Sequence, residues 1–217
     1  MNSSHSRMLL STVAIIGLIS TATLSKSSAD NSLFPTTKGS TWKYSGTAAA
    51  TKLSMGSVIS DVKTSNGVST VEITWDVDGR VTQKETYLVS KQGVSRAKSG
   101  ATGKDVLNPP IPIIKYPAKI GQSWNWKGTI TVGTNVVPAT GILTVTSLDD
   151  IKTKAGGFKA YCVSLALTVT QGAAKISLQN KYWFAAGAGL IKQTLILPGQ
   201  DGKSVVVDCS VDSFKIK

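Results

Sequence analysis

Histidine is almost absent from this sequence. The only one, His5, lies in an N-terminal segment that we expect to be removed during secretion. A mature chain without histidine cannot use a Ser-His-Asp or Cys-His catalytic arrangement, and it cannot bind zinc or iron through imidazole. Two cysteines are too few for an all-cysteine zinc site. The sequence therefore predicts no metal, no cofactor and no histidine-dependent enzyme.

Complete catalytic motifs are also lacking. There is no Gly-x-Ser-x-Gly motif, and no helix is expected after Gly187-Ala188-Gly189, as a nucleotide-binding loop would require. Asp76-Val77-Asp78-Gly79 resembles the start of a calcium loop but lacks its closing glutamate, so a hairpin turn explains it better. Glu72, Asp76 and Glu85 could place carboxylates on one face, as a glycosidase needs, but an ordinary polar sheet face accounts for them. We therefore expect a protein that is not an enzyme.

The N-terminus has the pattern of a secretory signal peptide. A short polar stretch ends at Arg7, an apolar run extends from Met8 to Ile19, and small polar residues lead to Ala29. We expect a signal-peptide helix over residues 1–29, removed by cleavage after Ala29. An uncleaved anchor is the alternative, although the apolar segment is short for a bilayer span. The mature chain, residues 30–217, is then secreted or periplasmic.

Acidic residues are few, so the chain is strongly basic. Losing Arg7 and Lys26 with the signal peptide lowers the formal net charge from +12 to +10. The mature chain keeps twenty scattered lysines but only Arg80 and Arg96 as arginines. Proteins that read nucleic-acid sequence concentrate arginine in stripes, so we expect no sequence-specific nucleic acid as a partner. Scattered lysines solvate a surface and protect sheet edges, and they leave an anionic envelope polymer as a candidate partner.

The two cysteines, Cys162 and Cys209, are candidates for a disulfide, because an even count in an oxidising compartment favours pairing. Their strand patterns point the other way. Cys162 falls on the small, polar side of its alternation and Cys209 on the apolar side, so the two side chains need not face each other. Both alternatives stay open from the sequence.

The most informative feature is an internal repeat. Residues 34–47 and 116–129 align without a gap at an offset of 82. They share an aromatic-Pro pair, a glycine, a Trp-x-aromatic pair and a final Gly-Thr. Each copy predicts a turn that leads into a strand with its two aromatic side chains on one face. We interpret the mature chain as two duplicated β halves.

Strand and turn patterns continue through the rest of the chain. Val71, Ile73 and Trp75 alternate with polar residues, and Asp78-Gly79 predicts a tight hairpin turn. We count about eleven strands, which favours an all-β fold: an antiparallel half-barrel, barrel or sandwich. The predicted halves are residues 30–107 and 115–217, joined by a proline-rich connector at 108–114 whose three prolines argue against a central strand. Residues 30–217 would form one compact domain.

Six aromatic residues are the candidates for a ligand site. They could line a cavity for an apolar molecule, or they could fill the core and hold the two halves together, as aromatic side chains often do. The candidates are Trp42, Tyr44, Trp75, Trp124, Trp126 and Trp183.

The repeated frame, together with Tyr182-Trp183-Phe184-Ala185 and Gly189-Leu190-Ile191-Lys192, resembles secreted bacterial families of unknown function that include TapB-like proteins. The motifs are structural turns and carry no chemistry. A weaker similarity links these families to lipoprotein carriers of the LolA type, which implies a curved antiparallel sheet with an apolar concave face. This sequence lacks the family's proline near Ala186 and shows no lid helices, so no functional residue is carried over.

Two functional hypotheses follow. The first is a non-enzymatic extracytoplasmic binding protein for an apolar or amphipathic ligand, such as a lipid or acyl chain. The second is a structural or interaction module of the envelope or secreted matrix, which binds anionic surfaces through its lysines.

Overall fold

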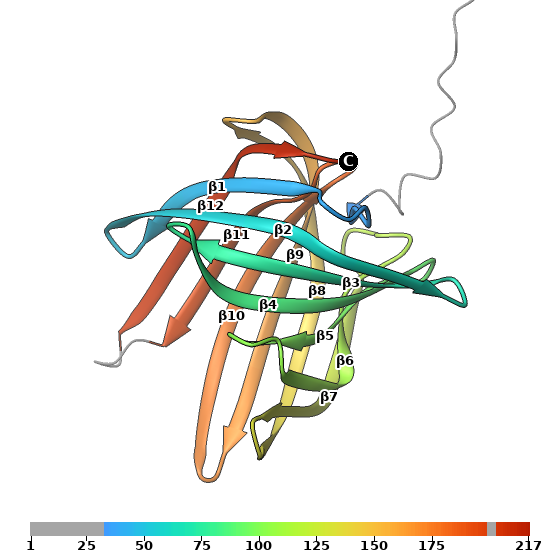
Figure 1. Ribbon diagram of the computed structural model, residues 1–217. Helices are drawn as coiled ribbons and strands as arrows, with labels where there is room; N and C mark the ends of the chain where they lie inside the picture. The colour runs from blue at the N-terminus through green and yellow to red at the C-terminus, as the bar shows by residue number, and fades with distance from the viewer. Residues whose placement is uncertain (1–32, 199–202) are drawn as a thin grey trace, which may run out of the picture.

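The computed structural model describes residues 33–198 and 203–217, which form a closed antiparallel β-barrel (Figure 1). The expected signal peptide lies outside the described residues. Each strand pairs with its neighbours in sequence, and the first pairs with the last to close the barrel. The strands are β1 (Thr41–Ala48), β2 (Thr51–Ser65), β3 (Val68–Val77), β4 (Arg80–Ser90), β5 (Gly93–Ser99), β6 (Asp105–Lys115), β7 (Ser123–Val132), β8 (Asn135–Thr153), β9 (Gly156–Gln171), β10 (Ala174–Ala185), β11 (Gly189–Pro198) and β12 (Ser204–Lys215).

The all-β antiparallel class is therefore confirmed, and among the three architectures considered the chain adopts the barrel. The described residues hold twelve strands, one more than we counted. The alternation of apolar and polar residues explains most of these strands. Val71, Ile73 and Trp75 are buried, and β3 turns into β4 at Asp78 and Gly79, whose positive φ values of 50° and 77° suit a tight hairpin.

The two copies of the repeated frame make matching backbone hydrogen bonds before their strands begin. In the first copy, Gly39 N donates to Ile59 O at 2.8 Å and Ile59 N donates to Ser40 O at 3.0 Å. In the second, Gly121 N donates to Val145 O at 2.8 Å and Val145 N donates to Gln122 O at 2.9 Å. The bend before β1 is thus hydrogen-bonded to β2, and the bend before β7 is hydrogen-bonded to β8. A duplication of the whole chain stays a prediction.

The final glycine of each copy lies where two strands come unusually close. A Cβ on Gly46 of β1 would stand 1.9 Å from the carbonyl oxygen of Asp208 on β12. A Cβ on Gly128 of β7 would stand 2.4 Å from the carbonyl oxygen of Asn108 on β6. Both contacts are with backbone, which cannot rotate away. The shared glycine is therefore explained by close packing of strands.

The proline-rich segment corrects our expectation of a connector, because residues 105–115 form strand β6. Proline lacks the N–H that a ladder needs, and the β6–β7 ladder is correspondingly short: it joins only Val106–Asn108 to Thr129–Thr131. Past Asn108 along β6, the indole of Trp124 donates to Pro112 O at 2.8 Å, and the indole of Trp126 donates to Pro109 O at 2.9 Å. Tryptophan side chains thus take over where backbone pairing stops.

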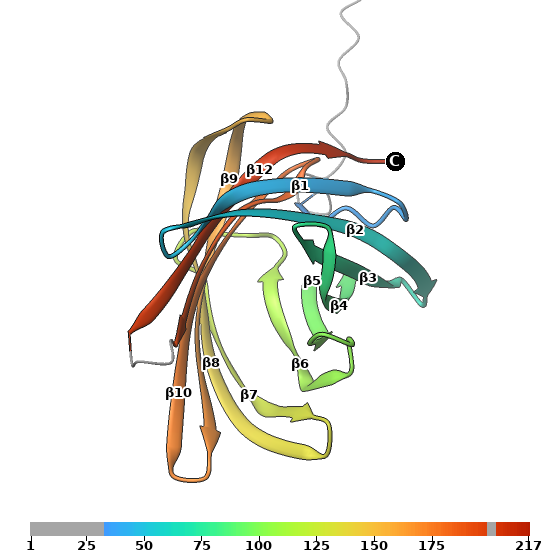
Figure 2. The same ribbon diagram turned by 60° about the vertical axis from the view of Figure 1, so that its left-hand side comes forward.

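The barrel has two unlike ends. Because the strands alternate in direction, the β1–β2, β3–β4, β7–β8 and β9–β10 hairpins share one end, and the β8–β9 turn lies at the other (Figure 2). The segment before β1 covers this second end. Leu33 and Phe34 are buried there, and the Phe34 ring lies 4.9 Å from that of Tyr87. We call these the hairpin end and the covered end.

Cys162 and Cys209 are both buried, free thiols. In the ladders Cys162 is paired with Trp183, which does not line the barrel's main cavity, whereas Cys209 is paired with Gln193, which does. Paired residues share a face of the sheet, so the two thiols point to opposite faces.

Candidate ligand-binding site

A cavity of about 380 Å³ lies inside the barrel. Its walls come from β1–β6, β10 and β11, together with Phe34 and Pro35 of the segment that precedes β1. Most of its lining is aromatic or aliphatic. The exposure of the lining residues shows which end is open: Leu197 is 37% exposed and Thr82 is exposed at the hairpin end, whereas Phe34 and Phe184 are buried toward the covered end.

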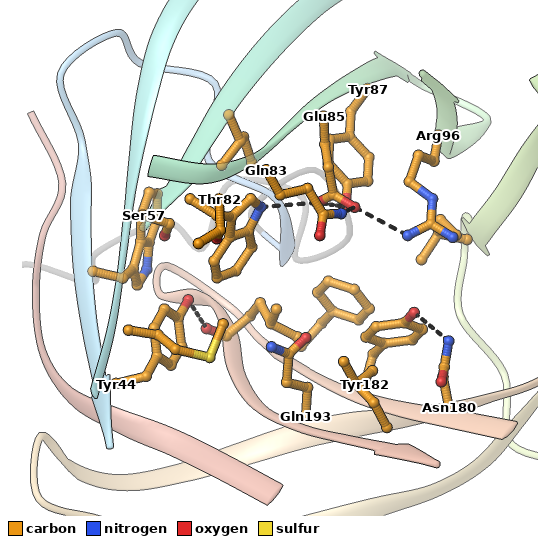
Figure 3. A pocket seen from close by; sticks show the side chains of 18 of the residues that line it. Tyr44, Ser57, Thr82, Gln83, Glu85, Tyr87, Arg96, Asn180, Tyr182 and Gln193 are labelled. Carbon is orange, nitrogen blue, oxygen red and sulfur yellow. Dashed lines mark hydrogen bonds and ion pairs between the residues drawn. The ribbon is translucent and has the colours of Figure 1, made fainter. Parts of the chain in front are cut away.

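A buried carboxylate is the centre of a polar cluster in this cavity (Figure 3). Glu85 is 5% exposed, and its Oε2 accepts hydrogen bonds from Trp75 Nε1 at 2.9 Å and from the Tyr87 hydroxyl at 2.8 Å. Its Oε1 accepts from Gln83 Nε2 and from Arg96 Nη1, both at 3.0 Å. A carboxylate offers about four acceptor positions, so these four donors use them all.

Arg96 balances the charge of Glu85. Its side chain is 14% exposed and reaches the cluster from β5, the strand next to β4. Burial alone would lower the pKa of the guanidinium, but Tyr182 and Glu85 beside it raise that pKa above the usual value. Arg96 therefore keeps its positive charge inside the barrel. Its Nε is buried and has no hydrogen-bond partner.

Tyr182 and Asn180 face this pair from β10 (Figure 3). Asn180 Nδ2 donates to the Tyr182 hydroxyl oxygen at 3.0 Å, while Asn180 Oδ1 is buried without a partner. Burial raises the pKa of Tyr182 and of Tyr87, so both phenols are neutral at physiological pH. The cluster thus combines one balanced ion pair with neutral hydrogen-bonding groups, and two of its polar atoms have no partner in the protein.

Three of the six aromatic candidates line the cavity: Trp42, Tyr44 and Trp75. Trp42 Nε1 donates to Ala188 O, and the Tyr44 hydroxyl donates to Leu190 O at 2.9 Å, so both rings are held by the backbone around the β10–β11 turn. Burial raises the pKa of Tyr44 far above its ordinary value. These side chains form a fixed wall.

The other three candidates do not line the cavity. Trp124 and Trp126 bridge the interrupted β6–β7 ladder, as described above. The indole of Trp183 donates to Asp149 Oδ2 at 2.8 Å, and Lys192 Nζ lies 5.1 Å from the centre of its ring. For these three residues the structural alternative, in which aromatic rings hold the sheet together, matches the contacts.

The sequence analysis considered Glu85 only as a possible glycosidase carboxylate and set it aside, and it did not single out Arg96 or Gln193 as site residues. A signal was present, because alternate residues of a strand share a face. Glu85 is in phase with Tyr87 and Val89, Arg96 with Val94, and Gln193 with Ile191 and Leu195. A polar residue at a position that should face the apolar interior is unusual, so this pattern could have indicated all three as candidate site residues.

The carboxylate set considered for glycoside hydrolysis is not assembled. Glu72 is exposed, and in the ladder it is paired with Thr86, whereas Glu85 is paired with Ile73 on the buried face. Glu85 and Glu72 therefore point to opposite sides of the sheet. The acceptor positions of Glu85 are already used by its four hydrogen-bond donors.

The residues that the structure describes contain no group of three or more histidine, cysteine or acidic side chains placed to hold a metal ion. Across residues 33–198 and 203–217, no helix has the length and hydropathy needed to cross a bilayer.

Comparison with known proteins identifies the fold. No family model matches the sequence, and no curated protein matches it. One similar solved structure is a candidate lipoprotein from Parabacteroides distasonis, with 14% identity and a TM-score of 0.52. Another is a candidate exported protein with a YmcC-like fold from Bacteroides fragilis, with 10% identity and a TM-score of 0.51. Each alignment covers 84% of this chain and 98% of the other. At such identities the likeness shows a shared fold, and the resemblance to TapB-like proteins and LolA-type carriers stays a prediction.

Proposed function

We propose that this protein is a non-enzymatic extracytoplasmic binding protein that holds one amphipathic ligand, such as a lipid or acyl chain, inside its barrel. The cavity is the observation that carries the proposal. Its volume of about 380 Å³ falls within the roughly 300–1,000 Å³ that ligand pockets occupy, and a mainly apolar lining with a few polar groups is their usual composition.

The position of the cavity supports the same function. It lies within a closed hydrogen-bonded wall, with buried aromatic rings at one end and half-buried aliphatic side chains, such as Met55, Leu178 and Leu195, at the other. Such a gradient suits a molecule with a flexible apolar chain. Small β-barrels commonly hold one ligand in this way.

The compartment is inferred from two sources. The N-terminal sequence has the order of a secretory signal peptide. The two solved structures that share the fold are described as a lipoprotein and as an exported protein, respectively. Both sources favour a mature protein that works outside the cytoplasm.

Native mass spectrometry of the mature protein, purified without detergent from its own compartment, is the first test. We expect an added mass that organic extraction identifies as an amphiphile. In parallel, Leu178→Trp should fill the cavity mouth and abolish the binding of a fluorescent fatty probe. Gln179→Trp is the matched control, because Gln179 is exposed on the opposite face of the same strand. A protein that carries no ligand and binds no amphiphilic probe would contradict the proposal.

A second candidate function rests on the surface. All lysines from Lys38 to Lys217 except Lys192 are exposed, as an interaction module for anionic envelope polymers would require. Binding of this kind should weaken steeply as salt is added, since exposed charges are screened within about 10 Å at 0.1 M ionic strength. Retention on an anionic polymer that is unchanged by high salt would exclude it.

A further inference from the structure

The charge balance of the cavity carries an inference about the ligand. Among the residues that line it, only Glu85 and Arg96 are charged, and they form a direct ion pair at 3.0 Å. The other polar lining side chains that can hydrogen-bond are neutral: Tyr44, Ser57, Trp42, Trp75, Thr82, Gln83, Tyr87, Asn180, Tyr182 and Gln193. The cavity therefore presents hydrogen-bonding groups without net charge.

A charged ligand head would lack a counter-ion here. Glu85 already accepts four hydrogen bonds, and its charge and that of Arg96 balance each other. The free Arg96 Nε could donate a hydrogen bond to a ligand head, but a charged head would add a net charge that no other lining side chain balances. Burying a charge without a partner costs far more than burying a hydrogen-bonded neutral group. Neutral heads are thus favoured.

The ladder register gives the direction of the ligand. Along β10 the lining passes from Tyr182 through Asn180 to Leu178, and along β11 it passes from Gln193 to Leu195 and Leu197. On both strands, which run in opposite directions, the lining changes from the polar cluster to aliphatic side chains at the hairpin end. The step from Tyr182 to Leu178 covers about 13 Å of strand. This length suits a single chain of medium length that extends from an inner head toward the mouth.

Taking the proposed function as given, we propose that the ligand is a single-chain amphiphile with an uncharged, hydrogen-bonding head, such as an alcohol, an amide or an acylglycerol. The head lies inward beside Gln83, Tyr182 and Gln193, and the chain extends past Leu178 and Leu195 to the mouth. The unpartnered oxygen of Asn180 and the unpartnered Nε of Arg96 show that this cluster has hydrogen-bonding capacity that the protein itself leaves unused.

Three probes with the same chain test the inference: 1-decanol, decanoate and decyltrimethylammonium. Each would displace a fluorescent fatty probe from delipidated wild-type protein at neutral pH. We expect 1-decanol to bind at least about tenfold more tightly than either charged compound. Tighter binding of decanoate or of decyltrimethylammonium would overturn the inference and leave the proposed function intact. If the probe binds and none of the three displaces it, the inference fails while the proposed function stands. If the probe itself does not bind, the proposed function fails and the inference fails with it.

Two variants test the same charge balance from the protein side. Glu85→Gln leaves Arg96 without its counter-ion, so it should improve the binding of decanoate relative to 1-decanol by about tenfold or more. Arg96→Met leaves Glu85 unbalanced and should shift the preference toward decyltrimethylammonium instead. If folded protein of either variant kept the wild-type order of affinities, the ion pair would not control the choice of head. The wild-type comparison decides the question even if neither variant folds.

Discussion

Removing the Arg96 guanidinium should destabilise the barrel much more than removing a surface lysine from an equally short ion pair. Arg96→Met keeps a long apolar side chain and deletes the charge. Glu85, which is 5% exposed, would then keep three neutral donors and lose its only cation. Breaking a buried ion pair by removing one partner costs about 3–5 kcal/mol, because the remaining charge stays buried without compensation. We expect a loss of unfolding free energy in this range.

The chain offers a control with similar geometry. Lys154 Nζ lies 3.1 Å from Asp212 Oδ2, close to the 3.0 Å of the buried pair, but Lys154 is 69% exposed. Exposed ion pairs contribute about 0–1 kcal/mol, so Lys154→Met should have a small effect. The two substitutions differ mainly in burial, and their comparison isolates the cost of desolvating the charge that remains.

A double variant completes the cycle. In Glu85→Gln with Arg96→Met no uncompensated charge remains, so the combined cost should be lower than the sum of the single costs by about 2 kcal/mol. Urea unfolding followed by tryptophan fluorescence gives the free energies, provided that the slopes agree among the variants. If Arg96→Met cost no more than Lys154→Met, or if the two cavity substitutions were additive, the argument for a tightly coupled buried pair would be refuted.

Gly46→Ala should lower the unfolding free energy by about 3 kcal/mol, at the upper end for overpacking, because its Cβ would meet the backbone of β12. Gly141→Ala is the control in the same unfolding assay, because the nearest contact of its Cβ would be an ordinary 3.4 Å. Equal costs for the two substitutions would contradict a close approach of β1 and β12 at Gly46. The unfolding free energy should also fall as the pH rises above about 10, because burial raises the pKa of Tyr44, Tyr87 and Tyr182 in the folded state. Since the unfolded chain then loses its phenolic protons first, this stabilisation is complete below the unfolded pKa and is lost above it, and urea midpoints that stay flat across that range would disagree. Burial also raises the pKa of Cys162 and Cys209, so both should be alkylated in denaturant without reductant and neither in the native state; intact-mass analysis that finds no label after unfolding would mean that they are bridged.

Local features of the fold were predictable from the sequence because they depend on neighbouring residues. The alternation of Val71, Ile73 and Trp75 gave the buried face of β3, and Asp78-Gly79 gave its hairpin. The closure of the barrel was not predictable in this way. It depends on pairing between β1 and β12, and a hydropathy pattern says that a strand has a buried face without saying which strand lies beside it.

The proline-rich segment shows how a sound local rule can give a wrong element. Three prolines do weaken a ladder, and the β6–β7 ladder is interrupted where they lie. We did not foresee that Trp124 and Trp126 would bond to the carbonyls of that same segment. The strand persists because side chains from its neighbour replace the missing backbone donors.

The candidate site was predictable only in its apolar part. Trp42, Tyr44 and Trp75 line the cavity, but a tryptophan pattern alone does not separate them from Trp183, which bonds to Asp149 instead. The polar cluster could have been suspected from the phase of Glu85 with Tyr87. Its meaning depends on Arg96 and Tyr182, which come from other strands and are brought together only by the barrel.

The pairing of β1 with β12 also determines when the cavity can exist. Every other ladder joins strands that are adjacent in sequence and can form as the chain grows. The β1–β12 ladder, which pairs Trp42 with Phe214, can form only after β12 has been synthesised. Until then β1 and β12 each expose an edge of unpaired backbone groups that could pair with another chain. Contacts so distant in sequence slow folding. Because β1 and β11 supply part of the cavity wall, a ligand that binds only the closed barrel would draw the folding equilibrium toward closure and shorten the time for which those edges are available to aggregate.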